Sequence, residues 1–140
     1  MPDHGLLGTY IGQSYEWMTF KEVERAARNF AAGCWKLGLN PVTQAEGKPW
    51  RFLGIQSKNR KEWNICHIAN MYTSTTTIAL YDTLGQEAIK FVTDQTELTT
   101  YCCSNDFVDK LTQLKLTDMD EKHPRMQRLV NLVSWEKVLD

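Results

Sequence analysis

Three histidines are the first candidates for catalysis or metal binding. His4, His67 and His123 are far apart in the sequence, and none has a carboxylate or cysteine partner at ligand spacing. His67 lies in a mostly apolar segment with helical spacing, where a hydrogen-bonded core histidine is commoner than a base or a ligand. The histidines therefore indicate neither a metal site nor a general base.

The four cysteines also lack the spacing of a reactive or metal-binding site. Cys102 and Cys103 are adjacent, Cys34 and Cys66 stand alone, and no Cys-x-x-Cys occurs. We expect free, buried thiols in a reducing, intracellular compartment. The alternation of side chains along a strand should bury one residue of the adjacent pair and expose the other.

A threonine-rich stretch from Thr73 to Thr77 has the hydroxyl content of a phosphate-binding loop. Such loops use glycine so that the backbone can approach the phosphate oxygens, but Thr75 stands where glycine would be needed and no lysine is near. Three consecutive threonines favour an extended backbone. We therefore predict that this stretch begins a strand.

Three basic residues, Lys58, Arg60 and Lys61, cluster where a strand gives way to a helix. Their charge and the helix dipole together could hold an anion. Ordinary exposed surface explains the same residues equally well, so the sequence leaves both interpretations open.

The segment Leu80–Gly85 follows a β-branched run and precedes a helical pattern, so it marks a change from strand to helix. Ligand sites of α/β proteins are found at such positions. The segment has no histidine, cysteine or lysine, and its one carboxylate, Asp82, is expected to cap the following helix. Its composition therefore argues against catalysis.

Strands alternate with helices along the chain, which predicts right-handed crossovers and a layered α/β fold with a largely parallel sheet and flanking helices. Residues 1–14 are expected to be a surface lead-in and residues 40–49 a loop. Thr19 and Glu22 predict a capping box, Gly38 a helix end, and Asn59 and Ser104 or Asn105 further caps. The expected strands are 15–18, 50–56, 75–80, 98–103 and 129–133, and the expected helices are 20–37, 63–71, one from about 86, and one from about 105.

Composition narrows the class of protein. The 140 residues carry 16 basic and 17 acidic side chains, for a net charge of −1, so the basic surface of a nucleic-acid binder is not expected. No apolar run approaches the roughly 20 residues that span a bilayer, and Met1–Gly5 lacks a secretory signal. We therefore expect a soluble chain.

Several stretches of the chain, taken together in type, order and spacing, are specific to one protein family. The most specific is Leu80–Gly85, and the others are Tyr15–Val23, Gly54-Ile55, Asn59–Trp63, Glu87-Ala88-Ile89, Phe91 and Thr96-Glu97. These stretches resemble the N-terminal part of a long-chain acyl-CoA synthetase, a member of the adenylate-forming, AMP-binding enzymes. The likeness runs from about Gly8 to Leu132, and Lys61 departs from the family, which commonly has proline at that position.

The resemblance implies that residues 1–140 form a single partial domain, the N-terminal lobe of the AMP-binding domain. The family uses ATP and magnesium to turn a fatty acid into an acyl-adenylate and then passes the acyl group to coenzyme A. Its phosphate loop, metal carboxylate and catalytic lysine lie beyond the matched region, so no catalytic, cofactor-binding or metal-ligating residue is assigned here.

Two hypotheses follow from the resemblance. The chain is a fragment of a long-chain fatty acid–CoA ligase that does not catalyse alone and has the rest of the synthetase as its partner. Alternatively, it is a non-catalytic interaction or structural subunit derived from that lobe. The family further suggests association with endoplasmic reticulum, mitochondrial or peroxisomal membranes.

Overall fold

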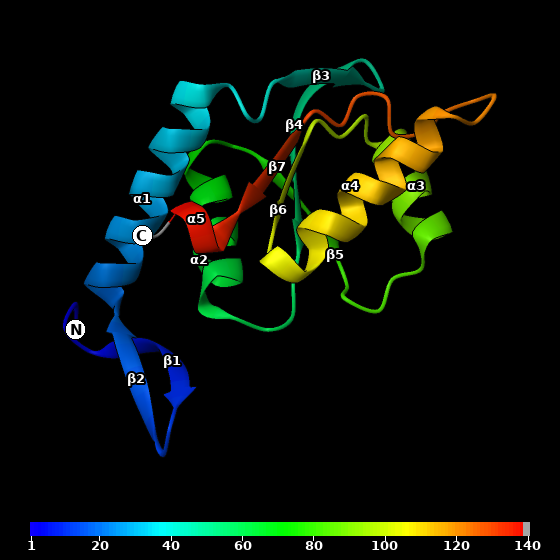
Figure 1. The fold of residues 1–140 in the computed structure, drawn as a ribbon. Helices are drawn as coiled ribbons and strands as arrows, with labels where there is room; N and C mark the ends of the chain where they lie inside the picture. Colours follow the sequence, from blue (N-terminus) through cyan, green and yellow to red (C-terminus); the bar gives the residue numbers. More distant parts are fainter. Residues whose placement is uncertain (139–140) are drawn as a thin grey trace.

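The computed structural model describes residues 1–138, with side chains described through Glu136. Its strands and helices alternate as predicted, apart from two N-terminal hairpins (Figure 1). The elements are β1 (Gly5–Ile11), β2 (Ser14–Thr19), α1 (Phe20–Leu37), β3 (Val42–Ala45), β4 (Lys48–Gln56), α2 (Lys61–Tyr72), β5 (Thr76–Leu80), α3 (Gln86–Gln95), β6 (Thr100–Cys103), α4 (Asn105–Met119), β7 (Asn131–Ser134) and α5 (Trp135–Val138).

Four parallel strands in the order β5-β4-β6-β7 make up most of the main sheet. The long central strand β4 pairs with β5 through Phe52–Gln56 and with β6 through Gly54–Gln56. Its first half pairs antiparallel with β3. The predicted layered α/β fold with a largely parallel sheet is therefore confirmed.

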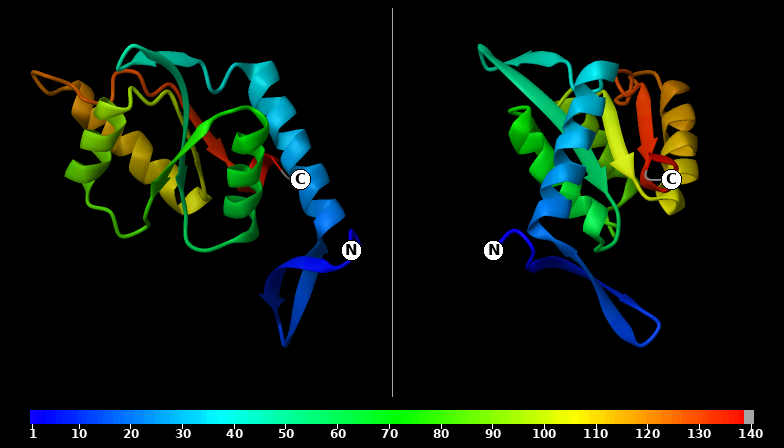
Figure 2. Two further views of the ribbon diagram at one scale, coloured as in Figure 1. Left: turned by 180° about the vertical axis from the view of Figure 1, so that it is seen from behind. Right: turned by 90° about the vertical axis from the view of Figure 1, so that its left-hand side faces the viewer.

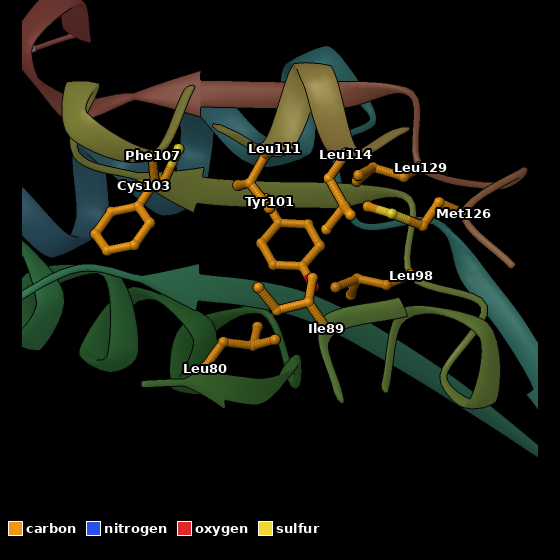
Figure 3. Packing of buried hydrophobic residues seen from close by; sticks show 10 residues of the cluster. All are labelled: Leu80, Ile89, Leu98, Tyr101, Cys103, Phe107, Leu111, Leu114, Met126 and Leu129. Carbon is orange, nitrogen blue, oxygen red and sulfur yellow. The ribbon is translucent and has the colours of Figure 1, made fainter. Parts of the chain in front are cut away.

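Helices cover both faces of this sheet (Figure 2). On one face α3 and α4 pack over β6, forming a core around Tyr101 and Leu98 (Figure 3). On the other face α2 packs against β4, with Cys66 beside Ile55. Helix α1 then packs on the outer side of α2. Helix α2 thus lies between the sheet and α1, which explains why it is apolar on most sides.

Helix α1 begins and ends as its sequence predicts. The Thr19 hydroxyl accepts a hydrogen bond from the backbone N–H of Glu22, and the Glu22 carboxylate accepts one from the N–H of Thr19. Gly38 ends the helix at φ 63°, in the left-handed region that glycine tolerates best. Met18 packs against the cluster that contains Val23, as expected for a hydrophobic staple.

Two segments that the sequence analysis treated as irregular are hairpins. Residues 5–11 form β1, which pairs antiparallel with β2, although they remain largely at the surface. In residues 40–49, Glu46 and Gly47 both have positive φ, 53° and 71°. That backbone geometry allows a tight two-residue turn, so β3 can pair with β4. Local turn geometry thus overrides the polar, proline-containing composition that suggested a loop.

Two predicted caps, at Asn59 and Asp82, are wrong, and a third, at Ser104, is confirmed in position only. The residue that precedes α2 is Arg60 rather than Asn59, and the one that precedes α3 is Gly85 rather than Asp82. A hydrogen bond from the N–H of Leu84 to the carbonyl of Tyr81 inserts a turn after β5, which separates Asp82 from the helix. Ser104 does precede α4, but its side chain makes no capping hydrogen bond.

Candidate functional site

The carboxyl ends of the parallel strands bring four connecting segments to one edge of the sheet. They are 57–60 after β4, 81–85 after β5, Ser104 after β6, and α5 after β7. A hollow of about 530 Å³ lies between residues 57–60 and Tyr81-Asp82. A second, of about 720 Å³, lies between Lys58–Glu62, Ser104 and the β1 strand. This edge is where open α/β sheets bind ligands, so we take it as the candidate site.

Arg60 is the centre of a polar network at this edge. Its Nε lies 2.7 Å from Glu62 Oε2, and its Nη1 lies 2.5 Å from Glu136 Oε1. The other oxygen of Glu136 accepts hydrogen bonds from the backbone N–H of Asn105 and from the Ser134 hydroxyl, both at 3.1 Å. Glu136 thus satisfies a backbone donor at the start of α4 that Ser104 leaves free.

The network shifts the protonation of both charged partners. Burial alone would raise the pKa of Glu136, but hydrogen bonds from Arg60 and Ser134 outweigh it and hold that pKa below its ordinary value. Burial likewise opposes the charge of Arg60, while hydrogen bonds to Glu62 and Glu136 raise its pKa. Both groups are therefore charged and paired, and neither is poised to exchange a proton near neutral pH.

The pairing of Arg60 bears on the anion site considered from the sequence. Two carboxylates surround its guanidinium, so its charge is already neutralised. Of the three basic residues in the predicted cluster, this leaves Lys58 and Lys61 to hold an anion. Lys58 is exposed and Lys61 is half-buried. The geometry favours surface lysines beside a structural ion pair over a built anion site.

The segment Leu80–Gly85 lies at the candidate site, but its side chains do little chemistry there. Leu80 is buried in the core between the sheet and α3–α4. Tyr81 is exposed, and its backbone carbonyl accepts a hydrogen bond from Gln56 Nε2 at 3.3 Å. Asp82 is exposed on the turn. The segment therefore connects β5 to α3 and supports this edge of the sheet through the buried Leu80 and the backbone of Tyr81. This structural role agrees with its composition.

The threonine-rich stretch lies at the opposite end of the sheet, where β5 begins. Thr75 accepts a hydrogen bond from Asn40 Nδ2 at 2.6 Å, and Thr73 contacts Thr75 through their hydroxyls at 2.9 Å. Thr77 accepts one from Asn70 Nδ2 at 2.8 Å. These hydroxyls hold the end of α2 against the sheet, so the predicted start of a strand is confirmed and the position is remote from the carboxyl edge.

His67 is hydrogen-bonded within the structure, as its sequence context predicts. Its Nδ1 lies 3.0 Å from the Thr77 hydroxyl, and its ring packs 5.5 Å from the ring of Trp63. His4 and His123 are exposed. Among residues 1–138, no three histidine, cysteine or acidic side chains are grouped so that they could hold a metal ion.

All four cysteines are free and buried, as predicted, but the expected difference between Cys102 and Cys103 is wrong. Both are fully buried because helices cover both faces of β6: Cys102 faces α2 and Cys103 faces α4. Burial raises the pKa of Cys34 and of Cys103 to about 12. Such thiols are poor nucleophiles at neutral pH.

A large apolar groove lies away from the carboxyl edge, between α1 and β7. It has a volume of about 880 Å³, and its lining includes Phe30, Leu37, Ile65 and residues 130–133. Leu37 and Val130 are each 71 % exposed there. In the described part of the chain β7 pairs only with β6, so the groove runs beside an open sheet edge.

The sequence analysis missed Glu136 and Gln56 as residues of the carboxyl edge. The signal for both was position, because each lies at or just after the end of a predicted parallel strand. Gln56 is 1 % exposed, and its Oε1 has no hydrogen-bond partner among the described residues. A polar residue at the end of a predicted strand, such as Gln56, was therefore a better guide to the carboxyl edge of the sheet than the basic residues Lys58, Arg60 and Lys61.

Comparison with curated proteins gives relatives of one kind. Fatty acyl-CoA synthetase A of Dictyostelium discoideum is 32 % identical over 100 residues, which are 71 % of this chain and 14 % of that protein. Human long-chain-fatty-acid–CoA ligase 1 is 33 % identical over 104 residues, 74 % of this chain and 13 % of the ligase. The chain thus spans about one seventh of the length of these relatives. No family model matches it.

Solved structures share the fold at low sequence identity. The anthranilate CoA ligase AuaEII in complex with anthranoyl-AMP gives a TM-score of 0.70 at 12 % identity, over 89 % of this chain and 21 % of that one. A fatty acyl CoA synthetase of Mycobacterium tuberculosis gives 0.69 at 9 % identity, over 89 % and 22 %. These similarities show that the α/β arrangement is that of adenylate-forming enzymes.

Sequence and fold therefore agree, and they favour a ligase origin over a separate interaction module. No helix within residues 1–138 has the length and apolar character needed to cross a bilayer. The chain belongs to the long-chain fatty acid–CoA ligases and corresponds to a fragment of their adenylate-forming fold.

Proposed function

We propose that this chain is a supporting lobe of an ATP-dependent long-chain fatty acid–CoA ligase and contributes no catalytic group of its own. ATP, magnesium and coenzyme A are then bound by the rest of the enzyme. The polar groups at the carboxyl edge support this view, since Arg60 and Glu136 neutralise each other. A rate enhancement that depends on positioned phosphate ligands and metal needs residues outside this set.

The groove between α1 and β7 is the observation that carries this proposal. Leu37 and Val130 expose apolar surface on its two sides, and within the described residues β7 is paired along one edge only. An exposed apolar patch next to an open strand is typical of a surface that another part of the structure covers. The partner we propose is the remainder of the synthetase chain.

The four buried free thiols support an intracellular, reducing location for the enzyme. Any attachment to endoplasmic reticulum, mitochondrial or peroxisomal membranes is then assigned to the rest of the ligase.

A chimeric enzyme tests the proposal. The matched segment of human long-chain-fatty-acid–CoA ligase 1 is replaced by the matched part of this chain, and oleoyl-CoA formation is measured with ATP, magnesium and coenzyme A. We expect activity in the chimera and none above background for residues 1–140 alone. A soluble, folded but inactive chimera, or appreciable product from the isolated chain, would overturn the proposal.

Matched substitutions in the chimera test the groove itself. Leu37→Asp and Val130→Asp place a charge on its two exposed apolar sides and should lower activity at least tenfold, because an unpaired carboxylate would have to be buried. Leu116→Asp is the control, since Leu116 is also exposed but lies on α4, outside the groove. Equal activities in all three variants would place the interface elsewhere.

A further inference from the structure

The β1–β2 hairpin, which projects from the body of the molecule, carries a row of exposed aromatic side chains (Figures 1 and 2). Tyr10 is 62 % exposed, and Tyr15 and Trp17 are each 59 % exposed. Tyr10 pairs directly with Tyr15 in the ladder, and Trp17 lies two residues further along β2, so all three share one face of the hairpin. The ring centroids of Tyr10 and Tyr15 are 5.2 Å apart, and those of Tyr15 and Trp17 are 5.9 Å apart. The three rings, here called the aromatic row, therefore form one continuous surface.

The aromatic row is held in place by its own hairpin. The indole of Trp17 extends across two glycines: a Cβ added at Gly5 would lie 3.0 Å from its Cε3, and one added at Gly8 would lie 3.1 Å from its Cη2. Leu7 and Met18 pack against the cluster between α1 and α2 and so anchor the hairpin to the body. Side chains that are already ordered lose little conformational freedom when a partner binds them.

The composition of the hairpin is that of a buried protein interface. From Gly5 to Tyr15 the chain has no charged residue, although 24 % of the whole sequence is charged. Ile11 is 50 % exposed close to the turn. Interface cores are depleted of charged side chains and enriched in tyrosine and tryptophan, and these two aromatic residues are frequent among those that carry most of the binding energy. A hairpin that stays in water is usually protected by charges instead.

The aromatic row borders the groove between α1 and β7. Trp17 is part of the lining of that groove, and Tyr10 is part of the lining of the neighbouring hollow of about 720 Å³. Glu62 lines both, so the two recesses adjoin. The matched regions of the curated relatives are only 13–14 % of their length, so most of such a ligase lies outside the described residues. A protein surface that fills the groove would also meet the aromatic row.

We propose that the aromatic row docks an uncharged, largely apolar surface of the remainder of the synthetase, as a continuation of the groove; this rests on the proposed ligase function. Trp17 is the anchor, because it lies between the groove and the two tyrosines. The tyrosine hydroxyls and the indole N–H are donors for carbonyl groups of that surface, while the rings supply the apolar contact.

Hydroxyl-radical footprinting tests the proposal, with the chimeric ligase built to include the whole hairpin. Side-chain oxidation is compared between residues 1–140 alone and the chimera, both without lipid. We expect oxidation of Tyr10, Tyr15 and Trp17 to be about fivefold slower or more in the chimera, because a partner surface excludes water from them. Phe91, which is 58 % exposed on α3, is the control and should change by less than about twofold.

Footprinting needs a folded chimera but not an active one, so its result is separate from that of the activity assay. An active chimera with an unprotected aromatic row would overturn this proposal and leave the proposed function standing. A protected row in an inactive chimera would do the reverse. Protection of the isolated chain that grows with its concentration, or that appears only with phosphatidylcholine vesicles, would identify a second copy or a lipid surface as the occupant and overturn the proposal.

Substitutions in the isolated chain separate docking from a role in folding. Tyr10→Ser and Tyr15→Ser should each shift the urea midpoint by less than about 0.3 M, because both side chains are exposed in the lobe alone. Met18→Ser, in the cluster between α1 and α2, should lower the midpoint by about 1 M. Should the chimera not fold, these midpoints still decide: tyrosine substitutions as damaging as Met18→Ser would show that the row stabilises the hairpin itself.

Discussion

Arg60 Nη1 and Glu136 Oε1 lie 2.5 Å apart although 76 positions separate the two residues in the chain. The contact joins the segment after β4 to the helix after β7, which are the ends of strands not adjacent in the sheet. The Glu136 carboxylate also accepts a hydrogen bond from the backbone N–H of Asn105 at the start of α4. A single ion pair thus ties together three connections at the carboxyl edge.

Removal of Arg60 should destabilise the fold. Arg60→Ala leaves Glu62, whose side chain is 9 % exposed, without its cationic partner. We expect the free energy of unfolding to fall by about 1–2 kcal/mol, as measured by urea denaturation. Lys58→Ala, at an exposed position in the same segment, should change it by less than about 0.5 kcal/mol. Equal effects of the two substitutions would contradict a structural role for the ion pair.

The same ion pair predicts a dependence of stability on pH. The pKa of Glu136 is held below its ordinary value of 4.5 in the folded chain, so the unfolded chain binds its proton first on acidification. The stabilisation is fully present above that ordinary value and is lost as the pH falls through the lower, folded pKa. Urea titrations between pH 3 and 7 should show a smaller decline for Glu136→Gln than for the unsubstituted chain.

Gly54 allows a close approach between β4 and the core on the α3–α4 face. A Cβ at this position would lie 2.7 Å from Leu98 Cδ2 and 3.1 Å from the Tyr101 ring. Gly54→Ala should therefore cost about 1–3 kcal/mol of unfolding free energy through overpacking. Shortening the neighbour in the double variant with Leu98→Ala should give a smaller total loss than the sum of the two single losses.

Gly33→Ala is the control for Gly54→Ala, and we expect it to change the free energy of unfolding in the opposite direction. Apart from its chain neighbours and the backbone of α1 itself, no atom of the described residues lies within 4 Å of a Cβ added at Gly33, which is inside α1. Gly33→Ala should stabilise the chain by about 0.5–1 kcal/mol, because alanine loses less backbone entropy in a helix. Destabilisation by Gly33→Ala would show that the α1 surface is more crowded than described.

The thiols should be almost unreactive in the folded chain. A pKa of about 12 in place of 9.0 lowers the thiolate fraction of Cys34 and of Cys103 about a thousandfold near pH 8. Reaction with a disulfide reagent such as DTNB should therefore be slow in buffer and complete for four thiols in denaturant. Fast reaction of any one thiol under native conditions would contradict its burial.

The sequence predicted best where its signals were local or periodic. Thr19, Glu22 and Gly38 gave both ends of α1, because each acts on neighbouring backbone groups. Alternation of apolar strands with helical patterns gave the parallel sheet. The family resemblance was carried largely by short stretches such as Leu80–Gly85, and the curated relatives confirm it.

Features that depend on distant parts of the chain were not predictable in this way. The burial of both Cys102 and Cys103 requires helices on both faces of β6, which a local alternation rule does not include. The backbone donor at the start of α4 is satisfied by Glu136, which lies 31 positions away, so the nearer Ser104 was expected instead. The β3–β4 hairpin depends on two positive φ angles, one of them at a glutamate.

The central position of β4 also bears on how the chain folds during synthesis. Its first half pairs with the strand just before it, whereas its second half pairs with β5 and β6, which follow it. We expect the β3–β4 hairpin to form early, because its loop closure is short, and the parallel pairs to wait for later residues. When β4 has just left the ribosome, the β3–β4 hairpin can already be formed, but the second half of β4 is still unpaired. That half stays accessible to chaperones until β5 and β6 emerge.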